Sequence, residues 1–293
     1  MSGRAGAQVD DALSVRRFSF FRLLRENPRV AVSAGLIGLL FLLAILAPVI
    51  SPHDPIAQNP DNSYLPPGAG HLLGTDELGR DLLSRIIWGA RVSLPVALVA
   101  VGVGLSIGGL IGVVAGYRGK LTDLLLMRVI DALLAFPGII LAIAIVAALG
   151  PGLTHAMIAI GIVSVPVYAR LVRGQVLQLK NQEFITAVRA MGATPLRIIV
   201  RHIVPNLLNP VIVQVSLSAG FAILAEATLS FLGLGAQVPT PDWGQMINNG
   251  VRFLNNDPYL SLVPGVVISL TVFAFNLFGD SLRDALDPRL RNL

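Results

Sequence analysis

Six long apolar runs constrain the fold of this chain more than any other feature. Each is close in length to the roughly 20 residues that an α-helix needs to span the hydrocarbon core of a bilayer. A helix satisfies its backbone hydrogen bonds within one segment, as a lipid environment requires. We therefore expect an all-α membrane protein with about six transmembrane helices, over residues 30–50, 93–116, 121–149, 154–171, 210–234 and 260–278.

Composition supports a membrane protein and excludes several other classes. Hydrophobic residues make up 54% of the chain and charged residues 13%, whereas a soluble domain carries about 25% charged residues. The net charge of +5 does not indicate nucleic-acid binding, because the basic residues cluster at the ends of apolar runs. The chain contains no cysteine, which excludes disulfides, thiolate metal sites and cysteine nucleophiles.

The distribution of Lys and Arg predicts the topology. These residues concentrate in the segments before 30, around 118–128, at 170–201 and after 280, so the positive-inside rule places both termini in the cytoplasm of a cell (inner) membrane protein. The expected organisation is a cytoplasmic tail (1–29), a first helix and external loop with an amphipathic helix (30–92), a five-helix core that includes a cytoplasmic loop at 182–206 (93–280), and a cytoplasmic tail (281–293). The basic and aromatic stretch at 16–29 fits either a helix on the membrane surface or a plain positive flank.

Two local patterns predict helix packing. In the external loop, Thr75 or Asp76 is expected to cap a short helix that starts near Glu77 and has an apolar face formed by Leu82, Leu83, Ile86 and Ile87. In the second span, small residues recur at four-residue spacing, at Ala100, Gly104, Gly108, Gly112 and Gly116. This spacing lets two helix backbones approach closely, but it does not indicate the partner helix.

The stretch at 183–210 is charged and amphipathic although apolar spans flank it. Its first part, 182–191, predicts a helix with Phe184, Val188 and Met191 on one side. Gly192 is expected to break that helix. Thr194 and Pro195 should start a second helix as N-cap and first helical residue, which is expected to stop before Pro205. The prediction is a rigid, basic helical hairpin.

This stretch resembles the EAA loop of ABC-importer membrane subunits, through Ala187, Gly192 and the Ile203–Pro205 ending. Thr186 stands where that pattern usually has Glu, and Val188 where it has a second Ala. The resemblance implies that the loop docks into a cleft of an ATPase subunit and transmits ATP-driven closure. The residues expected to take part are Glu183, Thr186, Ala187, Arg189, Gly192, Ile203 and Pro205.

Further segments resemble the second (C-type) permease subunit of the dipeptide/oligopeptide/nickel branch of that family. They are GTDELGRDLLSRIIWGAR (74–91), RVIDALLAFPGIILAI (128–143), ILAEATLSFLGLGAQ followed by PTPDWG (223–244), and GDSLRDALDPRLR (279–291). The resemblance implies a type I ABC importer permease fold and transport of di- or oligopeptides, with nickel or opine import as the alternative. It also implies a homologous second permease, two ATPase subunits or domains, and an extracytoplasmic binding protein. ATP and Mg²⁺ would bind to the ATPase partners, and this chain would bind no cofactor.

Polar residues inside or beside the spans are the remaining candidate sites. Asp131 and Glu226 lie within apolar runs, where a carboxylate is costly, and they either line a transport path or form paired structural groups. In the loop at 235–259, Trp243 suits a membrane interface. Together with Pro239 and Pro241, it is expected to face the binding protein.

No enzymatic or nucleotide site is indicated. Leu121 stands where a phosphate loop needs Ser or Thr after the glycine–lysine pair at 119–120, and the G-x-S-x-G match at 104–108 lies within a span rather than in a strand–turn–helix. The histidines are scattered and show no metal-ligand spacing, at His53, His71, His155 and His202. An ion-coupled secondary transporter is a further alternative, which Asp131 and Glu226 would suit but which leaves the 183–205 loop unexplained.

Overall fold

The computed structural model describes residues 24–25, 27–68 and 70–286, so the expectations for residues 16–23 lie outside the described part. Within it the chain is helical, and the β-structure is limited to an isolated bridge between Thr75 and Asp81. The elements are α3 (Pro28–Ile50), η1 (Pro60–Asn62), α4 (Leu82–Arg118), α5 (Lys120–Leu134), α6 (Gly138–Leu149), α7 (Leu153–Leu179), α8 (Glu183–Ala190), α9 (Pro195–Ile198), η2 (Ile199–Ile203), α10 (Val204–Phe231), α11 (Trp243–Val251) and α12 (Tyr259–Leu286). The all-α expectation is confirmed.

Five helical segments of the described chain are long and apolar enough to cross a membrane: α3, α4, α7, the continuous stretch Pro195–Phe231, and α12. Helices α5 and α6 meet at an angle of 88°, so they add a sixth span only if this bent pair is counted as one broken span. The break lies at Pro137, since proline lacks the N–H that a continuous helix needs. The structure thus has five spans, or six with the bent pair counted as one, in agreement with the expectation of about six.

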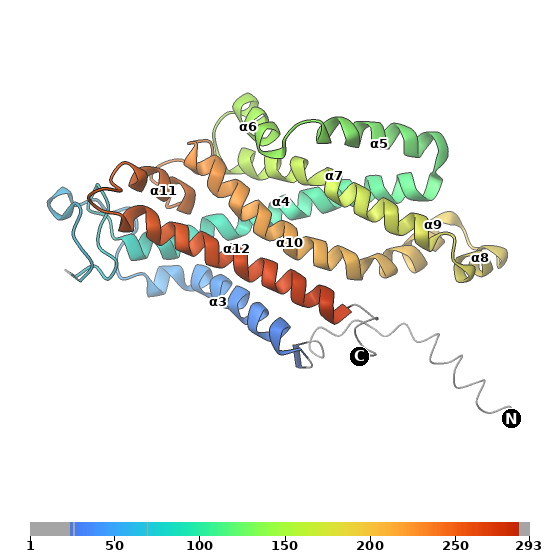
Figure 1. The fold of residues 1–293 in the computed structure, drawn as a ribbon, viewed down its shortest axis with the longest axis horizontal. Helices are drawn as coiled ribbons and strands as arrows, with labels where there is room; N and C mark the ends of the chain where they lie inside the picture. The colour runs from blue at the N-terminus through green and yellow to red at the C-terminus, as the bar shows by residue number, and fades with distance from the viewer. Residues whose placement is uncertain (1–23, 26, 69, 287–293) are drawn as a thin grey trace.

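The helices form an elongated bundle (Figure 1). The spans α4, α7, α10 and α12 run along its length, and α5 and α6 flank it on one side. One end, here called the loop end, carries residues 51–81 and α11, while the other, here called the hairpin end, carries α8 and α9. Helix α3 starts and helix α12 ends toward the hairpin end. The chain therefore enters its first span and leaves its last span on the same side of the bundle.

The glycines of α4 form its contact with α7. A Cβ atom at Gly112 would lie 2.6 Å from the Ala169 carbonyl oxygen, and one at Gly104 would lie 2.8 Å from Ser164 Cβ. Gly108 is equally tight against the backbone of α7. The predicted close approach is confirmed, and the structure identifies the partner that the spacing alone could not.

The start of α4 differs from the prediction. The helix begins at Leu82, and its N-cap is Asp81, whose carboxylate accepts a hydrogen bond from the Ser84 N–H. No helix starts near Glu77, because the Asp76 side chain accepts from the N–H groups of Leu78 and Arg80 and holds a turn there. The expected amphipathic helix is therefore the first part of α4, and the expected boundary between 92 and 93 falls within one continuous helix.

The second half of the hairpin also differs from the prediction. The helix that starts at Pro195 does not stop before Pro205 but continues through the π-helical turn η2 into α10. In that turn the Val204 N–H donates to the Ile199 carbonyl, five residues back. Pro205, the second residue of α10, has no N–H to donate to the preceding turn, and the π-helical turn lies directly before this helix. The hairpin is thus a rigid extension of a transmembrane span.

Candidate functional site

The hairpin end contains the predicted turn at Gly192. Its φ of 82° lies in the left-handed region. The Gly192 N–H donates to the Arg189 carbonyl at 3.0 Å, and the Ala193 N–H donates to the Val188 carbonyl at 3.3 Å. This pair of bonds is the Schellman motif, which ends a helix through a left-handed residue. The glycine break is therefore confirmed.

The restart after the turn is confirmed as well. Thr194 is the N-cap of α9, and its hydroxyl accepts from the Arg197 N–H at 3.4 Å. Pro195 is the first helical residue, where its fixed φ suits the helix. The direction of the chain between α8 and α9 is thus set by local chemistry on both sides of Gly192.

The hairpin packs firmly on the bundle. Ile185 from α8 and Ile198 from α9 are buried in one cluster with Val172 and Val176 of α7 and Leu207 of α10. Of the residues predicted to share one side of the first helix, Val188 packs against this cluster, whereas Phe184 and Met191 are exposed. Ile185 is the residue of α8 that points inward.

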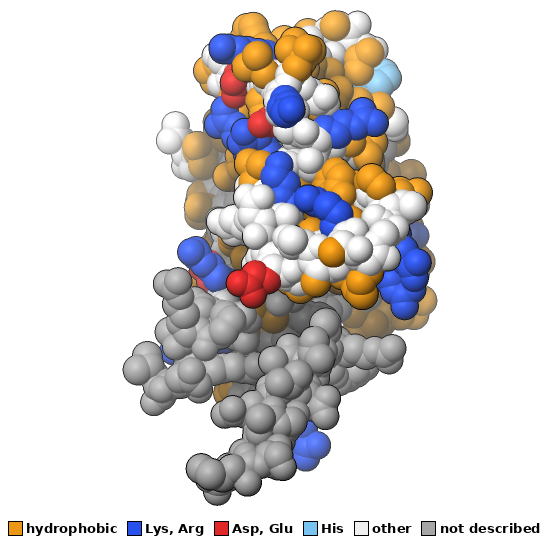
Figure 2. Space-filling model, turned by 90° about the vertical axis from the view of Figure 1, so that its right-hand side faces the viewer, with side chains coloured by type: hydrophobic (Ala, Val, Ile, Leu, Met, Phe, Trp, Pro, Cys, Tyr) orange, Lys and Arg blue, Asp and Glu red, His pale blue; other side chains and the backbone are white. Residues whose placement is uncertain are grey.

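The outer surface of the hairpin is apolar at its tip and basic around it. Met191 is 78% exposed and Leu196 is 71% exposed, and Arg189, Arg197 and Arg201 are exposed nearby. Figure 2 looks onto this end and shows Lys and Arg side chains interspersed with hydrophobic ones. Exposed apolar side chains next to charged ones are typical of an interaction surface.

Most of the residues predicted for coupling lie on this outer surface. The exposed ones are Glu183, Thr186, Ala187, Arg189, Gly192 and Pro205. Ile203 is fully buried in the cluster beneath the hairpin, so it supports the hairpin rather than faces a partner. The Thr186 hydroxyl donates to the Gln182 carbonyl at 3.4 Å, so at this position the side chain is turned toward its own helix.

Asp131 forms an ion pair with an arginine of a neighbouring helix. Its carboxylate accepts from Arg170 at 2.7 Å, across α5 and α7. Arg173 makes a two-point pair with Asp123 between the same helices, at 2.5 and 2.7 Å. Planar Arg–carboxylate pairs of this kind fix orientation as well as contribute energy. The arrangement favours a structural role for Asp131, which holds α5 onto α7.

Glu226 is fully buried and belongs to a second carboxyl pair. It accepts from the Ser230 hydroxyl at 2.9 Å, and the carboxyl group of Asp242, the N-cap of α11, lies within hydrogen-bonding reach. Among the described residues, Glu226 Oε2 and Asp242 Oδ2 have no donor. This geometry favours the structural alternative and links α10 to α11.

Trp243 is placed differently from the prediction. It is 1% exposed, and its indole N–H donates to the Ile86 carbonyl at 2.9 Å. The ring packs over Gly89, where a Cβ would lie 2.6 Å from it. The interpretation as a membrane-interface residue is therefore wrong, because the ring fills a slot in α4. Pro241 is also buried, whereas Pro239 is exposed at the loop end.

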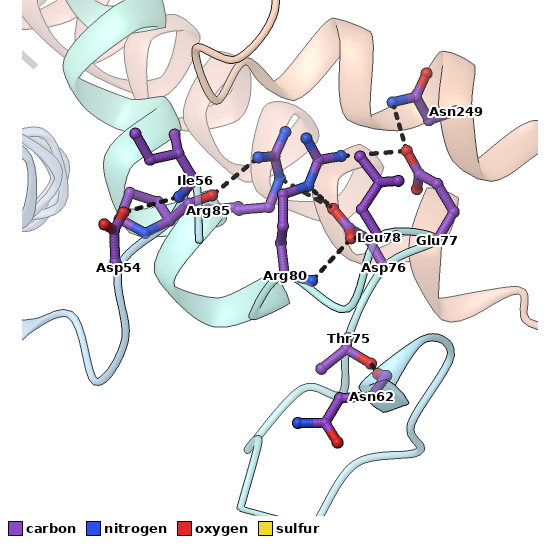
Figure 3. A network of polar contacts seen from close by, with 11 residues as sticks. Asp54, Ile56, Asn62, Thr75, Asp76, Glu77, Leu78, Arg80, Arg85 and Asn249 are labelled. Carbon is purple, nitrogen blue, oxygen red and sulfur yellow. Dashed lines mark hydrogen bonds and ion pairs between the residues drawn. The ribbon is translucent and has the colours of Figure 1, made fainter. Parts of the chain in front are cut away.

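A network of charged residues organises the loop end (Figure 3). The buried Asp76 carboxylate pairs with Arg80 at 2.7 Å and with Arg85 at 3.4 Å. Glu77 pairs with Arg80 and accepts from Asn249 of α11 at 3.1 Å. Sequence reasoning did not predict this network, although the opposite charges four residues apart at Asp76 and Arg80 were a signal for it.

The loop end also brings together His53 and His71, which are far apart in the sequence. His71 Nδ1 lies 2.8 Å from Asp81 Oδ1, and His53 Nδ1 lies 3.6 Å from the same oxygen. Burial alone would raise the pKa of the Asp81 carboxyl. Hydrogen bonds from Ser84 and His71, with His53 nearby, outweigh burial and hold that pKa below its usual value. Ligand spacing in the sequence could not reveal this cluster, because it joins separate turns of an irregular loop.

An open pocket of about 610 Å³ lies between α7, α10 and α12 toward the hairpin end. Apolar side chains form much of its lining, and the amides of Gln175, Asn209 and Gln214 and the guanidinium of Arg283 supply its polar part. Gln214 donates to the Ser218 hydroxyl at 3.1 Å. Amide groups within otherwise apolar spans provide neutral hydrogen-bond donors and acceptors.

Comparison with known proteins decides the family. The model of the binding-protein-dependent transport system inner membrane component matches residues 108–292. The chain belongs to this family. The model of the N-terminal transmembrane domain of oligopeptide transport permease C matches residues 18–67, which confirms the resemblance to a C-type permease.

Two relatives align with this permease over most of both chains. The dipeptide transport system permease protein DppC of Alkalihalophilus pseudofirmus is 47% identical, over 93% of this chain and 90% of the relative. The glutathione transport system permease protein GsiD of Pectobacterium atrosepticum is 45% identical, over 92% and 90%. A chain of the MetNI methionine ABC transporter in an inward-facing conformation has a TM-score of 0.58 at 20% identity, over 70% of this permease and 98% of that chain. The expected ABC importer permease fold is confirmed.

Proposed function

We propose that this permease forms, with a second permease, the translocation path of an ATP-driven importer of short peptides. The observation that carries the substrate class is the near full-length identity of 47% and 45% to permeases of dipeptide and glutathione transport systems. Both of those substrates are short peptides. Nickel and opines are the alternative substrates.

Energy is proposed to come from partner subunits. Two ATPase subunits or domains would bind ATP and Mg²⁺, and an extracytoplasmic binding protein would deliver the peptide. The hairpin suits the contact with the ATPase, because its base is buried in the α7–α10 cluster and its apolar tip at Met191 and Leu196 is exposed. Movement of the tip would then be transmitted to two spans at once. The ATPase must bind the inward and outward states with different affinity for this to drive transport.

The amide-lined pocket is proposed to be part of the path. Peptide groups of the substrate need hydrogen-bond partners inside the membrane, and Gln175, Asn209 and Gln214 supply them beside the guanidinium of Arg283. Asp131 and Glu226, by contrast, are already paired with Arg170 and Asp242.

Single cysteines test the partner assignment and the orientation together. The chain has no cysteine of its own, so Met191→Cys and Val238→Cys each add one thiol at an exposed position, 78% and 68% exposed. In the assembled transporter, Met191→Cys should cross-link to the ATPase because it lies at the hairpin tip. Val238→Cys should cross-link to the binding protein because it lies beside Pro239 at the loop end.

Each variant serves as the control of the other. Capture of the ATPase from Val238→Cys, or of the binding protein from Met191→Cys, would contradict the proposed orientation. The substrate is tested by competition for uptake among a dipeptide, glutathione, an opine and Ni²⁺. Only the peptides are expected to compete.

A further inference from the structure

Three side chains that can bind a metal meet at the loop end. His53 follows α3, His71 belongs to the irregular loop, and Asp81 is the N-cap of α4. One ligand atom from each lies within 4.8 Å of the other two. The two imidazole rings face each other with centroids 4.5 Å apart, and both direct Nδ1 toward the same carboxylate oxygen.

The spacing of these atoms suits a tetrahedral cation. Zinc binds imidazole nitrogen and carboxylate oxygen at about 2.0–2.2 Å, so neighbouring ligand atoms of a tetrahedral site are about 3.3 Å apart. The observed Nδ1–Oδ1 distances of 2.8 and 3.6 Å lie on either side of that value. An ordinary hydrogen bond explains the His71 distance but not the orientation of His53, which is beyond hydrogen-bonding range of Asp81.

The surroundings already hold the ligands in place. The second oxygen of Asp81 accepts from both the N–H and the hydroxyl of Ser84, each at 2.7 Å. The backbone N–H of His53 donates to the same hydroxyl at 3.1 Å. Ser84 therefore orients two of the three ligand residues, as outer-shell partners do in metal sites.

Exposure leaves one side of the cluster open. The side chain of Asp81 is fully buried and that of His71 is 12% exposed, whereas that of His53 is 43% exposed. His53 lines an open pocket of about 850 Å³ together with Pro239 and Pro241. A cation can enter from this side, and water can occupy its fourth coordination position.

We propose that His53, His71 and Asp81 form a binding site for Zn²⁺ or a similar divalent transition cation. The cation would fasten the start and the middle of the loop at 51–81 to the first turn of α4. Its role would be structural, because it would tie His53 and His71 of the loop to the N-cap residue of α4. The proposal does not depend on the nature of the transported substrate.

Zinc binding to the full-length chain, purified in detergent with a tag that lacks histidine, tests the proposal. We expect one zinc per chain by competition with a chromogenic chelator, and X-ray absorption should detect two imidazole ligands. His53→Ala should weaken binding at least about tenfold. This variant should fold normally, since the hydrogen bond of His53 to Ser84 uses only its backbone. His155→Ala and His202→Ala, which change histidines elsewhere, should bind zinc like the wild type.

Hydrogen exchange of the loop provides a second readout. Zinc should slow exchange over residues 51–81 of the wild type and leave the His53→Ala variant unchanged. The proposal is overturned if the wild type binds no stoichiometric zinc. It is equally overturned if His53→Ala and His71→Ala bind zinc as the wild type does, or if His155→Ala or His202→Ala reduces binding to the same extent, since binding would then be adventitious.

Discussion

Gly192 adopts a φ of 82° at the tip of the hairpin, and a Cβ atom there would meet no atom within 4 Å. A bulky residue would therefore act through backbone strain of about 1–2 kcal/mol rather than through a clash. Gly192→Val should lower ATP-driven uptake several-fold while membrane insertion stays normal. Gly192→Asn should remain close to wild type, because asparagine tolerates the left-handed region. Uptake in vesicles measures both, and equal uptake by the Val variant would contradict the coupling role.

Two substitutions at Glu226 distinguish a structural role from a role in lining the transport path. Glu226→Gln keeps the size of the side chain and supplies an N–H donor to Asp242, so stability and uptake should change little. Glu226→Leu leaves the Ser230 hydroxyl and the Asp242 carboxyl without their partner, and should destabilise by about 1–3 kcal/mol. Thermal unfolding and uptake assays measure the two effects. Loss of uptake in a stable Glu226→Gln variant would indicate that the path needs this charge.

Individual residues were predictable where local backbone chemistry decides their role. Gly192, Thr194 and Pro195 behave as their side chains dictate, in a turn, a cap and a first helical position. Trp243 was misplaced, because its burial depends on α4, which is distant in the sequence. The cluster of His53, His71 and Asp81 was missed for the same reason.

At the scale of elements, the contact between α4 and α7 depends on small residues. Gly112→Val would force its side chain into the Ala169 carbonyl and Val172, with atoms at 2.6 and 2.8 Å already from a Cβ. Overpacking of this kind costs about 1–3 kcal/mol, so the unfolding temperature in detergent should fall. Gly102→Val on the same helix is the matched control, since a Cβ there meets nothing within 4 Å. An equal fall in both variants would mean that helix propensity, not close packing, explains the glycines.

The lengths and hydropathy of the elements predicted the spans but not all of their ends. Apolar runs locate the helices, because a segment in lipid must satisfy all its backbone hydrogen bonds internally and an α-helix does so. The start of α4 depends on the Asp76 turn and the Asp81 cap, and the continuation past Pro205 depends on a π-helical turn. These local hydrogen bonds do not change the hydropathy pattern, so the helix ends were predicted wrongly.

At the scale of the whole molecule, the two ends of the bundle have different characters. The hairpin end has an exposed apolar tip with arginines around it, on a base buried between two spans. The loop end has a buried charge network that connects the loop at 51–81, α4 and α11. The motifs at these ends were recognisable in the sequence. Their three-dimensional arrangement required the packing of α4 on α7 and of α11 on α12, which periodicity does not specify.

The central claim is that this permease moves solute only when an ATPase acts on its hairpin. The most direct test is uptake of a labelled dipeptide into vesicles that contain this chain, the second permease, the ATPase and the binding protein, with ion gradients clamped by ionophores. We expect accumulation that requires ATP and every partner, and none with this chain alone. Accumulation against a gradient by this chain alone, or uptake that follows an ion gradient without ATP, would contradict it.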